Sequence, residues 1–557
     1  MDMGTIMAET DTGATADNGQ RGFLGWVERA GNKLPDPVFL FFYFIIALVV
    51  ISIISSLLGV NATLDEQVLG GMPDSQKSRF GIGADGIINA VSLLSPENIS
   101  RLWVEMPKTF THFHPLGYVL VVMLGAGVAE RSGLFASAMR SAVRGAPVFL
   151  LTPVVAAVAM IGNHAADAAY VVLIPLAGVL FASAGRHPMA GIAAAFAGVS
   201  GGFSANLFPG QLDALLYGIT EEAGEILNAG YDANIAGNWW FIAALMIIYL
   251  PIIWFVTDKI VEPRLGQWTP AEGADAASYS NEDKPLTPEQ KKGLRNAGLA
   301  VLGVIVLWLV MTLGPGTPLI NESSCPSAEA ATGTCSPISN YAPLFQSLVG
   351  GFLVLFLLSG WAYGAAAGTI KNHKDLVDMM AEAMKDMGYY LVLAFAAAHF
   401  VAMFAWSNLG LISAVHGANA IENSGLPLPI LLGVIVLFSA LINLFVGSAS
   451  AKWALLAPVM VPMLMLLGVS PDGATAVYRV GDSATNIITP LMVYFPLILV
   501  FAQRWNKQFG LGSLTAMMIP YSVWMLISGT LLVVLWAFLG FDLGPGAPMA
   551  YTLPTAN

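Results

Sequence analysis

Residues 443–490, NLFVGSASAKWALLAPVMVPMLMLLGVSPDGATAVYRVGDSATNIITP, decide the fold of this chain. Two apolar runs, residues 428–442 and 453–467, flank the polar start of this stretch, and each is shorter than the ~20 residues that a membrane-spanning helix needs. We therefore predict the two arms of a re-entrant hairpin. Because backbone groups at membrane depth must not face lipid, the hairpin tip is expected to line a water-filled cavity.

A broken helix is predicted to follow this hairpin. Ser470 can cap it, and Pro471 suits its first position. Arg479 and Asp482 lie three residues apart on one face, and Pro490 interrupts the helix before the next apolar run. Charged groups at mid-bilayer cost about 2.5 to 3.5 kcal/mol each, so they line a pathway or pair with each other. We favour a pathway, because a structural pair would not need the neighbouring hairpin tip.

A weaker copy of this pattern precedes it in the chain. A constant shift places residues 167–170 on residues 450–453, and a short slip then aligns residues 204–206 with residues 483–486. We predict a first hairpin at about residues 148–187 and a second at about residues 428–469. Interrupted segments that are paired in two halves of a chain indicate the binding site of a secondary transporter.

Composition places the 557-residue chain among membrane proteins with many spans. It is 56% hydrophobic and 11% charged, with a mean hydropathy of +0.69. A net charge of −12 and the lack of a basic patch argue against nucleic acid as a partner. No phosphate-binding Gly-Lys-Ser/Thr loop occurs, so we expect no cofactor and an ion gradient, rather than ATP, as the energy source.

Nine membrane-spanning helices are predicted, which together with the two hairpins give an all-α polytopic fold built as inverted repeats. The predicted spans are residues 38–58, 116–136, 189–207, 239–256, 294–313, 343–367, 388–411, 474–502 and 514–539. With the N-terminus in the cytoplasm and the C-terminus outside, 18 of the 24 Lys and Arg residues fall on the cytoplasmic side. The expected location is the lipid bilayer of the bacterial cytoplasmic membrane, with the hairpins entering from opposite leaflets.

The regions outside the spans lead to further expectations. Residues 1–24 are expected to form a disordered cytoplasmic tail, residues 25–541 a single membrane domain, and residues 542–557 an extracytoplasmic tail. Cys325 and Cys335 lie in an outer loop, where an oxidising periplasm favours a disulfide over two free thiols.

Hard oxygen ligands gather at the two tips and the two helix breaks, where freed carbonyls can complete a site for a small cation. The candidates are Asn163, Asp167, Ser204 and Asn206 in the first half, and Asn443, Ser450, Asp482 and Thr485 in the second. For any one of them, a hydrogen bond at a tip or helix cap is an equally good explanation. Asp167 and Asp482 are the strongest candidates.

Other polar residues allow competing interpretations. His399 lies in an apolar run, where it can relay protons or hydrogen-bond in the core, and Asp213 can guard the site or be solvated. Residues 198–202, GVSGG, match Gly-x-Ser-x-Gly, so an intramembrane serine protease with Ser200 as nucleophile and His164 or His399 as base is a second class of function. This signal is weak in a chain with 57 glycines, because small-residue helix packing also explains it.

Four segments, WVERAGNKLPDPVFLFF, GGFSANLFPGQLDALL, SASAKWALLAPVMVPML and YRVGDSATNIITPLMVYFP, resemble the AbgT family of p-aminobenzoyl-glutamate transporters. The resemblance implies nine spans with two opposed hairpins, a homodimer, and transport of the folate breakdown product p-aminobenzoyl-glutamate by an ion gradient. For some members it also implies export of sulfonamide antimetabolites. By matching motif it implicates Asp213, Asn443, Ser450, Trp453, Pro471, Arg479, Asp482 and Pro490, with Asn443 and Asp482 as sodium ligands.

The chemistry of that substrate suggests how it is held, because it joins an aromatic amide to a dicarboxylate. We expect Arg479 and half-helix N-termini to receive carboxylates and Trp453 to stack on the aminobenzoyl ring, although Trp453 can instead be an interfacial anchor. Import of p-aminobenzoyl-glutamate, proton-coupled export of sulfonamides and transport of another dicarboxylate all stay open. Sodium and protons both stay open as coupling ions.

Overall fold

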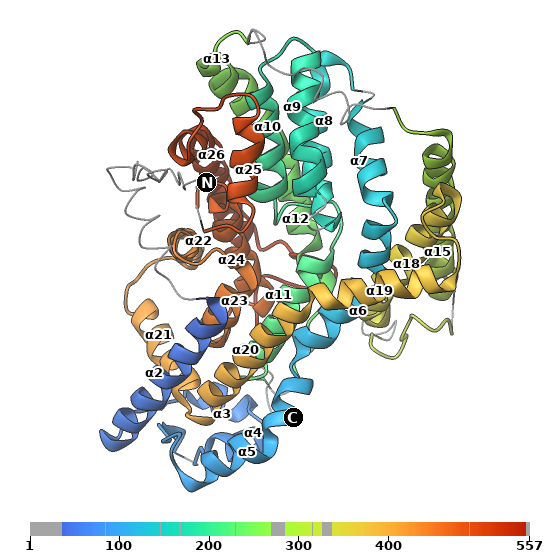
Figure 1. Cartoon of the computed structure of the whole chain (residues 1–557). Coiled ribbons are helices and arrows are strands. Elements are labelled where there is room, and N and C mark those ends of the chain that lie inside the picture. Colours follow the sequence, from blue (N-terminus) through green and yellow to red (C-terminus); the bar gives the residue numbers. More distant parts are fainter. Residues whose placement is uncertain are drawn as a thin grey trace, which may run out of the picture.

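The computed structural model describes residues 36–552 apart from residues 84, 145, 166–168, 229, 269–284, 315, 326–336 and 490. These residues are mostly helical, as predicted, with one two-stranded antiparallel ribbon (Figure 1). The elements of the first half are α2 (Pro37–Leu57), β1 (Asn61–Thr63), α3 (Glu66–Gly71), α4 (Asp74–Phe80), β2 (Ile87–Asn89), α5 (Pro96–Thr111), α6 (His114–Arg131), α7 (Leu134–Arg144), α8 (Leu151–Ile161), α9 (Ile174–Ser183), α10 (Pro188–Phe196), α11 (Gln211–Gly224), α12 (Trp239–Phe255), α13 (Glu262–Leu265) and α15 (Pro288–Thr312).

The second half of the chain is also helical. They are α17 (Ala342–Gln346), α18 (Leu348–Ala367), α19 (His373–Asp386), α20 (Gly388–Trp406), α21 (Leu409–Glu422), α22 (Leu428–Asn443), α23 (Ala449–Leu466), α24 (Pro471–Thr485), α25 (Phe495–Gln503) and α26 (Leu511–Leu539). Short 3₁₀ turns are η1 (Val148–Leu150), η2 (Gly162–Ala165), η5 (Ile235–Asn238) and η7 (Pro337–Tyr341), and π turns are η3 (Ala169–Leu173), η4 (Ala197–Gly201) and η6 (Val256–Val261).

Eight helices in the described part of the chain are long and apolar enough to cross a membrane. They are Val38–Leu57, Pro96–Arg131, Ile235–Leu265, Pro288–Thr312, Leu348–Ala367, Gly388–Trp406, Ala449–Leu466 and Leu511–Leu539. Seven of them coincide with predicted spans, and Ala449–Leu466 is the predicted second arm of the second hairpin. The two remaining predicted spans, residues 189–207 and 474–502, are interrupted helices.

The interruptions lie where Pro, Gly and polar residues predicted them. α10 passes into the π turn η4 and then into a non-helical segment, and α24 ends well before α25 begins. At the start of α24, the Ser470 Oγ accepts a hydrogen bond from Gly473 N at 3.1 Å, and Pro471 occupies the first turn. The predicted cap is therefore confirmed. The capping box of Thr287 and Gln290 at α15 is also present.

Two consecutive helices occupy each of the two segments predicted as hairpins, and we call each such pair a hairpin. The first consists of α8 and α9, and the second of α22 and α23. In each half the broken helix packs against the first arm: η4 and α10 against α8, and α24 against α22. The chain between η2 and η3, which includes Asp167, lies outside the described residues.

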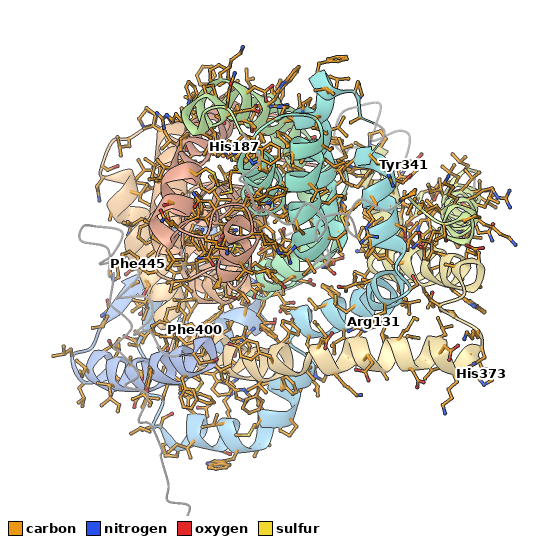
Figure 2. All side chains as sticks on the ribbon, turned by 45° about the horizontal axis from the view of Figure 1, so that its top comes forward. Arg131, His187, Tyr341, His373, Phe400 and Phe445 are labelled. Carbon is orange, nitrogen blue, oxygen red and sulfur yellow. The ribbon has the colours of Figure 1, made fainter. Side chains whose placement is uncertain are left out.

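The bases of the two hairpins lie at opposite ends of the long helical stretch Ile235–Leu265, which is about 45 Å long at 1.5 Å per residue. At its end, Arg186 from the base of the first hairpin contacts Asp258 and Glu262, and His187 N donates to Glu262 at 3.3 Å (Figure 2 labels His187). At its start, Phe241 N donates to Leu543 O at 3.0 Å.

The C-terminal segment that contains Leu543 also contacts the base of the second hairpin. Ser470 N donates to Met549 O at 3.0 Å, and Tyr551 N donates to Gly468 O at 2.8 Å. The segment predicted as a tail therefore packs between α12 and the second hairpin over residues 543–551. This arrangement places the two hairpin bases on opposite sides of the molecule.

The order of elements in the first half recurs in the second. The first half runs from α5 to α7, then through a hairpin to α10, α11 and α12; the second runs from α19 to α21, then through a hairpin to α24, α25 and α26. The helix that precedes each half packs on the other half, because α2 contacts α20 and α18 contacts α6. Figure 1 shows α8, α9 and α10 toward the top of the view and α2, α20 and α21 toward the bottom.

A peripheral arm is formed by α15 and α18, which pack on each other, and α18 also packs on α6. In Figure 2, α19 and α20 form an extended rod, with His373 at its outer end and Phe400 in the main body. Arg131 at the end of α6 pairs with Asp386 of that rod. Beyond α15, Cys325 is disulfide-bonded, while Cys335 lies outside the described residues.

The contact between α22 and α24 depends on a glycine. A methyl group at Gly481 would lie 2.3 Å from Val436 O and 2.8 Å from Ala440 N. We expect Gly481→Ala to lower the free energy of unfolding by about 1 to 3 kcal/mol, because the two helices would be forced apart. Thermal unfolding of the purified protein in detergent measures the effect.

The matched control is Gly303→Ala in α15, where a methyl group meets no atom within 4 Å among the described residues. This change is expected to be neutral or slightly stabilising, since Ala favours helix. Equal destabilisation by both variants would contradict the importance of close packing at Gly481.

Candidate functional site

A cavity of about 370 Å³ lies where the hairpin tips and the helix breaks meet. This volume falls within the range of about 300 to 1,000 Å³ that is typical of small-molecule pockets. The first half contributes Asn163 and His164 from the tip, and Phe203 and Asn206 from the break. The second half contributes Gly447 and Ala449 from the tip, and Asn486, Met492, Val493 and Tyr494 from the break. Both halves therefore enclose one cavity.

Two helix N-termini open onto this cavity. Gln211 begins α11 and Ala449 begins α23, and both residues line the wall. Backbone N–H groups and the helix dipole at such ends favour anions. Of the residues that line this cavity, none is Lys or Arg within the described part of the chain. Negative groups of a ligand would thus be received by helix ends rather than by basic side chains.

An aromatic pair closes part of the cavity. Tyr170 from the first hairpin stacks on Tyr494 from the second helix break, with ring centroids 4.3 Å apart and planes 13° apart. Both rings line the cavity, together with Phe203 and Tyr390. The pair joins the two halves and offers a flat surface for an aromatic ligand.

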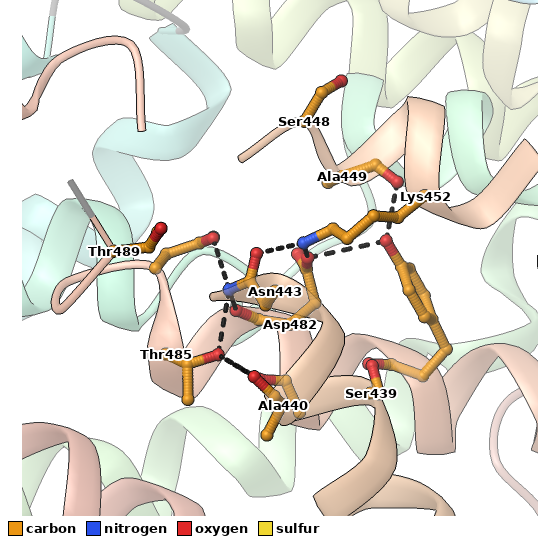
Figure 3. Close-up of polar contacts among 12 residues, drawn as sticks. Ser439, Ala440, Asn443, Ser448, Ala449, Lys452, Asp482, Thr485 and Thr489 are labelled. Carbon is orange, nitrogen blue, oxygen red and sulfur yellow. Dashed lines mark hydrogen bonds and ion pairs between the residues drawn. The ribbon is translucent and has the colours of Figure 1, made fainter. Parts of the chain in front are cut away.

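The second helix break contains a buried cluster of polar side chains (Figure 3). Lys452 Nζ contacts Oδ1 of Asn443 and Oδ1 of Asp482, and all three side chains are buried. The Asn443 amide donates to Asp482 O at 2.6 Å, to Thr485 Oγ1 at 2.9 Å and to Asn486 Oδ1 at 2.9 Å. Asn486 also lines the cavity, so the cluster lies directly behind the wall.

The first helix break resembles the second in one contact. Asn163 Nδ2 donates to Gly202 O at 3.5 Å, and Asn443 Nδ2 donates to Asp482 O. Both pairs span 39 residues, so each half uses an Asn near its hairpin tip to hold the carbonyl of its broken helix. The first half has no counterpart of the Lys452–Asp482 pair among its described residues.

Ser483 joins the two helix breaks. Its hydroxyl donates to Gly201 O at 2.8 Å and accepts from Ser204 N at 3.0 Å. Two buried polar atoms beside this link, Ser204 Oγ and Asn206 Oδ1, have no hydrogen-bond partner among the residues that the structure describes. These atoms are available to a cation or to a polar group of a ligand.

Arg479 pairs across the two halves of the chain. Its NH1 donates to Asp213 Oδ1 at 2.8 Å, and Asp213 Oδ2 accepts from Gly210 N at 2.7 Å. Both side chains are almost fully buried, but Asp213 borders the cavity while Arg479 lies behind it. The alternative of a structural Arg479–Asp482 pair is therefore wrong, because each residue pairs with a different element: Asp213 of α11 and Lys452 of α23.

Trp453 does not reach the cavity. Its side chain is fully buried, its ring stacks on Tyr478 at 4.4 Å, and its Nε1 donates to Thr220 Oγ1 at 2.9 Å. The expectation that Trp453 stacks on a ligand ring is corrected for this conformation, and so is the alternative of an interfacial anchor. The indole instead connects α23 to α11 and α24.

The remaining predicted residues fall into three groups. Ser450 and Pro471 do not line the main cavity: Ser450 borders a much smaller hollow, and Pro471 begins α24 at the hairpin base. Asp167 and Pro490 lie outside the described residues, so their predicted roles stay predictions. Asn163, Asn206, Asn443, Asp482 and Thr485 lie at the hairpin tips and helix breaks, as expected.

The serine-protease interpretation finds no support in the contacts of Ser200. Its hydroxyl is buried and donates to Met492 Sδ at 3.3 Å, and His399 Nδ1 contacts Phe395 O at 2.7 Å. The described residues contain no Ser200–histidine hydrogen bond and no group of three His, Cys, Asp or Glu residues suited to a metal. The amide and carboxylate oxygens of Asn443 and Asp482 are of the type that hard cations prefer as ligands.

Sequence reasoning missed three features of the site. It gave no role to Lys452, although a Lys within an apolar segment signals a pathway or a buried partner. It also missed His164 as a wall residue and the Tyr170–Tyr494 stack, whose members are too far apart in sequence for any periodic pattern to pair them. The ring of His164 lies so close to Gly210 that a methyl group there would be 2.3 Å from its Nδ1.

Comparison with known proteins gives consistent matches along the chain. The model of the AbgT putative transporter family matches residues 22–551. The p-aminobenzoyl-glutamate transport protein of Escherichia coli (strain K12) is 35% identical over 526 residues, covering 94% of this chain and 96% of that protein.

Two solved structures are similar throughout. The Alcanivorax borkumensis YdaH transporter has a TM-score of 0.80 and 38% identity, covering 92% of this chain and 100% of that one. Neisseria gonorrhoeae MtrF, described with a class of antimetabolite efflux pumps, has a TM-score of 0.83 and 40% identity, covering 95% of this chain and 100% of that one.

The Arg479–Asp213 pair leads to a test of stability. Asp213→Ala leaves a buried guanidinium without its carboxylate, so we expect it to lower the free energy of unfolding by about 3 to 5 kcal/mol. The double variant Asp213→Ala, Arg479→Met should lose less than the single variant, because no uncompensated charge is left. Denaturant unfolding in mixed micelles of these two variants and of Arg479→Met gives the three values, and a loss in the double variant equal to the sum of the two single losses would contradict the pairing.

Proposed function

The chain belongs to the AbgT putative transporter family, and on that premise we propose that it is a secondary transporter that carries p-aminobenzoyl-glutamate across the membrane at the expense of an ion gradient. The observation that carries this proposal is the single cavity enclosed by both hairpin tips and both helix breaks. A site shared by two structurally repeated halves is what alternating access requires.

The proposed arrangement in the membrane follows from the hairpin bases. They lie at opposite ends of Ile235–Leu265, which supports two re-entrant hairpins that enter from opposite leaflets as inverted repeats. We propose nine spans if the two broken helices are counted, with the N-terminus in the cytoplasm and the C-terminus outside a bacterial inner membrane. A homodimer is proposed from the family resemblance alone.

The cavity suggests a revised pose for the ligand. We place the two carboxylates of the glutamyl group at the N-termini of α11 and α23, and the aminobenzoyl ring on the Tyr170–Tyr494 stack. Arg479 then acts behind the wall by fixing Asp213, and Trp453 by fixing the first turn of α23. Both are positioning residues in this proposal.

A second candidate function is export of sulfonamide antimetabolites by proton exchange. It is favoured by the 40% identity with MtrF over nearly the whole chain. Sulfonamides share the aminobenzene ring but lack the dicarboxylate. They would therefore contact the tyrosine stack but not the two helix ends. A carrier of another dicarboxylate would show the opposite preference.

Tyr494→Ala tests the ring pose. We expect binding of p-aminobenzoyl-glutamate to weaken about tenfold, because stacking and apolar contact with the ring are lost, while binding of free glutamate changes little. Equilibrium binding to purified protein measures both affinities. Tyr43→Ala, on the outer face of α2, is the matched control and should change neither. Equal weakening for both ligands by Tyr494→Ala would reject the pose.

Uptake of labelled p-aminobenzoyl-glutamate into proteoliposomes tests the function itself. Sodium and proton gradients are imposed separately, each directed inward. We expect one of the two gradients, and not the other, to drive accumulation above the equilibrium level. Protein-free liposomes and a collapsed gradient are the controls. Accumulation of a labelled sulfonamide, but not of p-aminobenzoyl-glutamate, under an outward proton gradient would replace this proposal by the efflux function.

A further inference from the structure

Lys452 is a basic side chain enclosed at the heart of the second helix break. Its side chain is 1% exposed, and its ammonium group contacts one oxygen of Asn443 and one of Asp482 (Figure 3). These are the two residues for which the family resemblance implies sodium. We propose that Lys452 is a tethered cation: its ammonium group and a sodium ion bound to Asn443 and Asp482 are alternative occupants of one position.

The orientation of the Asn443 amide supports a cation position. Three acceptors, Asp482 O, Thr485 Oγ1 and Asn486 Oδ1, lie within hydrogen-bond distance of its Nδ2, which has two hydrogens to share among them. The amide oxygen must therefore point to the other side, where it meets Lys452 Nζ. An ammonium group has donors only, and sodium likewise accepts only oxygen lone pairs, so the same two oxygens suit either occupant.

Charge balance makes the two occupants exclusive. Asp482 is 1% exposed, and among the described residues Lys452 is its only ion-pair partner, since Arg479 is paired with Asp213. A buried carboxylate without a partner is strongly unfavourable, so Asp482 needs one positive charge in each state of the protein. A second cation in the same place would instead repel the ammonium group.

Displacement of Lys452 would remove a contact between the tip of the second hairpin and α24. Lys452 lies in the first turn of α23, next to Ala449, which lines the cavity, whereas Asp482 belongs to α24. The Lys452–Asp482 contact therefore ties the tip of the second hairpin to the broken helix. A sodium ion that takes its place breaks this tie between α23 and α24, and among the described residues it leaves Tyr478, which donates to Ala449 O at 2.6 Å, as the remaining polar side-chain link between these two helices.

This inference deepens the proposed function, because it states how an ion from the cavity side is coupled to a moving part. Asn486 both lines the cavity and bonds Asn443, so the ion position is one residue behind the wall. With no ion bound, the ammonium group of Lys452 balances the charge of Asp482, so the core of the unloaded carrier has no unpaired charge at this position. Sodium binding to the native protein is accordingly weakened by competition with its own side chain.

The test is the effect of sodium on thermal stability in the absence of any transported substrate. In Lys452→Met, Asp482 lacks its partner, so sodium should bind at least about tenfold more tightly and raise Tm by about 3 °C or more over equimolar choline chloride. The native protein should show a clearly smaller rise, and Lys452→Met, Asp482→Asn none. Lys385→Met, at an exposed lysine paired with Glu382, is the control and should behave like the native protein.

An equal sodium effect in the native protein and Lys452→Met, or none in either, would overturn the proposal. A second measurement covers the case in which Lys452→Met does not fold. Amine-reactive labelling of the native protein, read by mass spectrometry, should increase at Lys452 with rising sodium but not with choline, while labelling of Lys385 stays constant. Labelling of Lys452 that does not change with sodium concentration would also overturn the proposal. Neither assay uses p-aminobenzoyl-glutamate. The sodium effect can therefore be absent although uptake is observed, and it can be present although uptake is not.

Discussion

The structure depends on charge neutrality around one short helix, α24. Arg479 and Asp482 are both buried on it, and each is matched by a group from a different element: Asp213 from α11 and Lys452 from α23. Because a buried charge is tolerated only with a partner, these two pairs fix α24 to the first half of the chain and to the second hairpin at once. A pair within α24 itself would have satisfied the charges without joining any other element.

Close backbone packing allows these pairs to form. A methyl group at Gly198 would lie 2.5 Å from Ala159 Cβ, and one at Gly481 would lie 2.3 Å from Val436 O, so in both halves the broken helix lies directly against the first arm of its hairpin. The Asn-to-carbonyl bonds of Asn163 and Asn443 reinforce the same contact. Each hairpin and its broken helix thus form one tightly packed unit. Ser483 joins the two units through Gly201 O and Ser204 N.

Local signals allowed much of this fold to be predicted from the sequence. The lengths of apolar runs gave the hairpin arms, and Ser470 with Pro471 gave the start of α24, because capping depends on neighbouring residues. Pairings between distant residues were not predictable in this way. Arg479 and Asp213 are separated by 266 residues, and no periodicity connects them. Trp453 was misassigned for a related reason: a large aromatic residue near a hairpin tip suits a binding surface and a buried helix contact equally well, and only the position of Tyr478 decides between them.

The positions of the positive charges explain how one cavity can serve an anionic ligand without a basic lining. Lys452 and Arg479 both stand behind the wall, and each is neutralised by a carboxylate. The wall of the cavity therefore offers the helix ends at Gln211 and Ala449, whose partial charges favour a carboxylate less strongly than a free guanidinium would. Moderate attraction suits a carrier, because a ligand that is bound too tightly is not released on the other side. The full charges instead join α24 to α11 and α23, so the helix ends at the wall and the ion pairs behind it are separate groups that meet at Asp213.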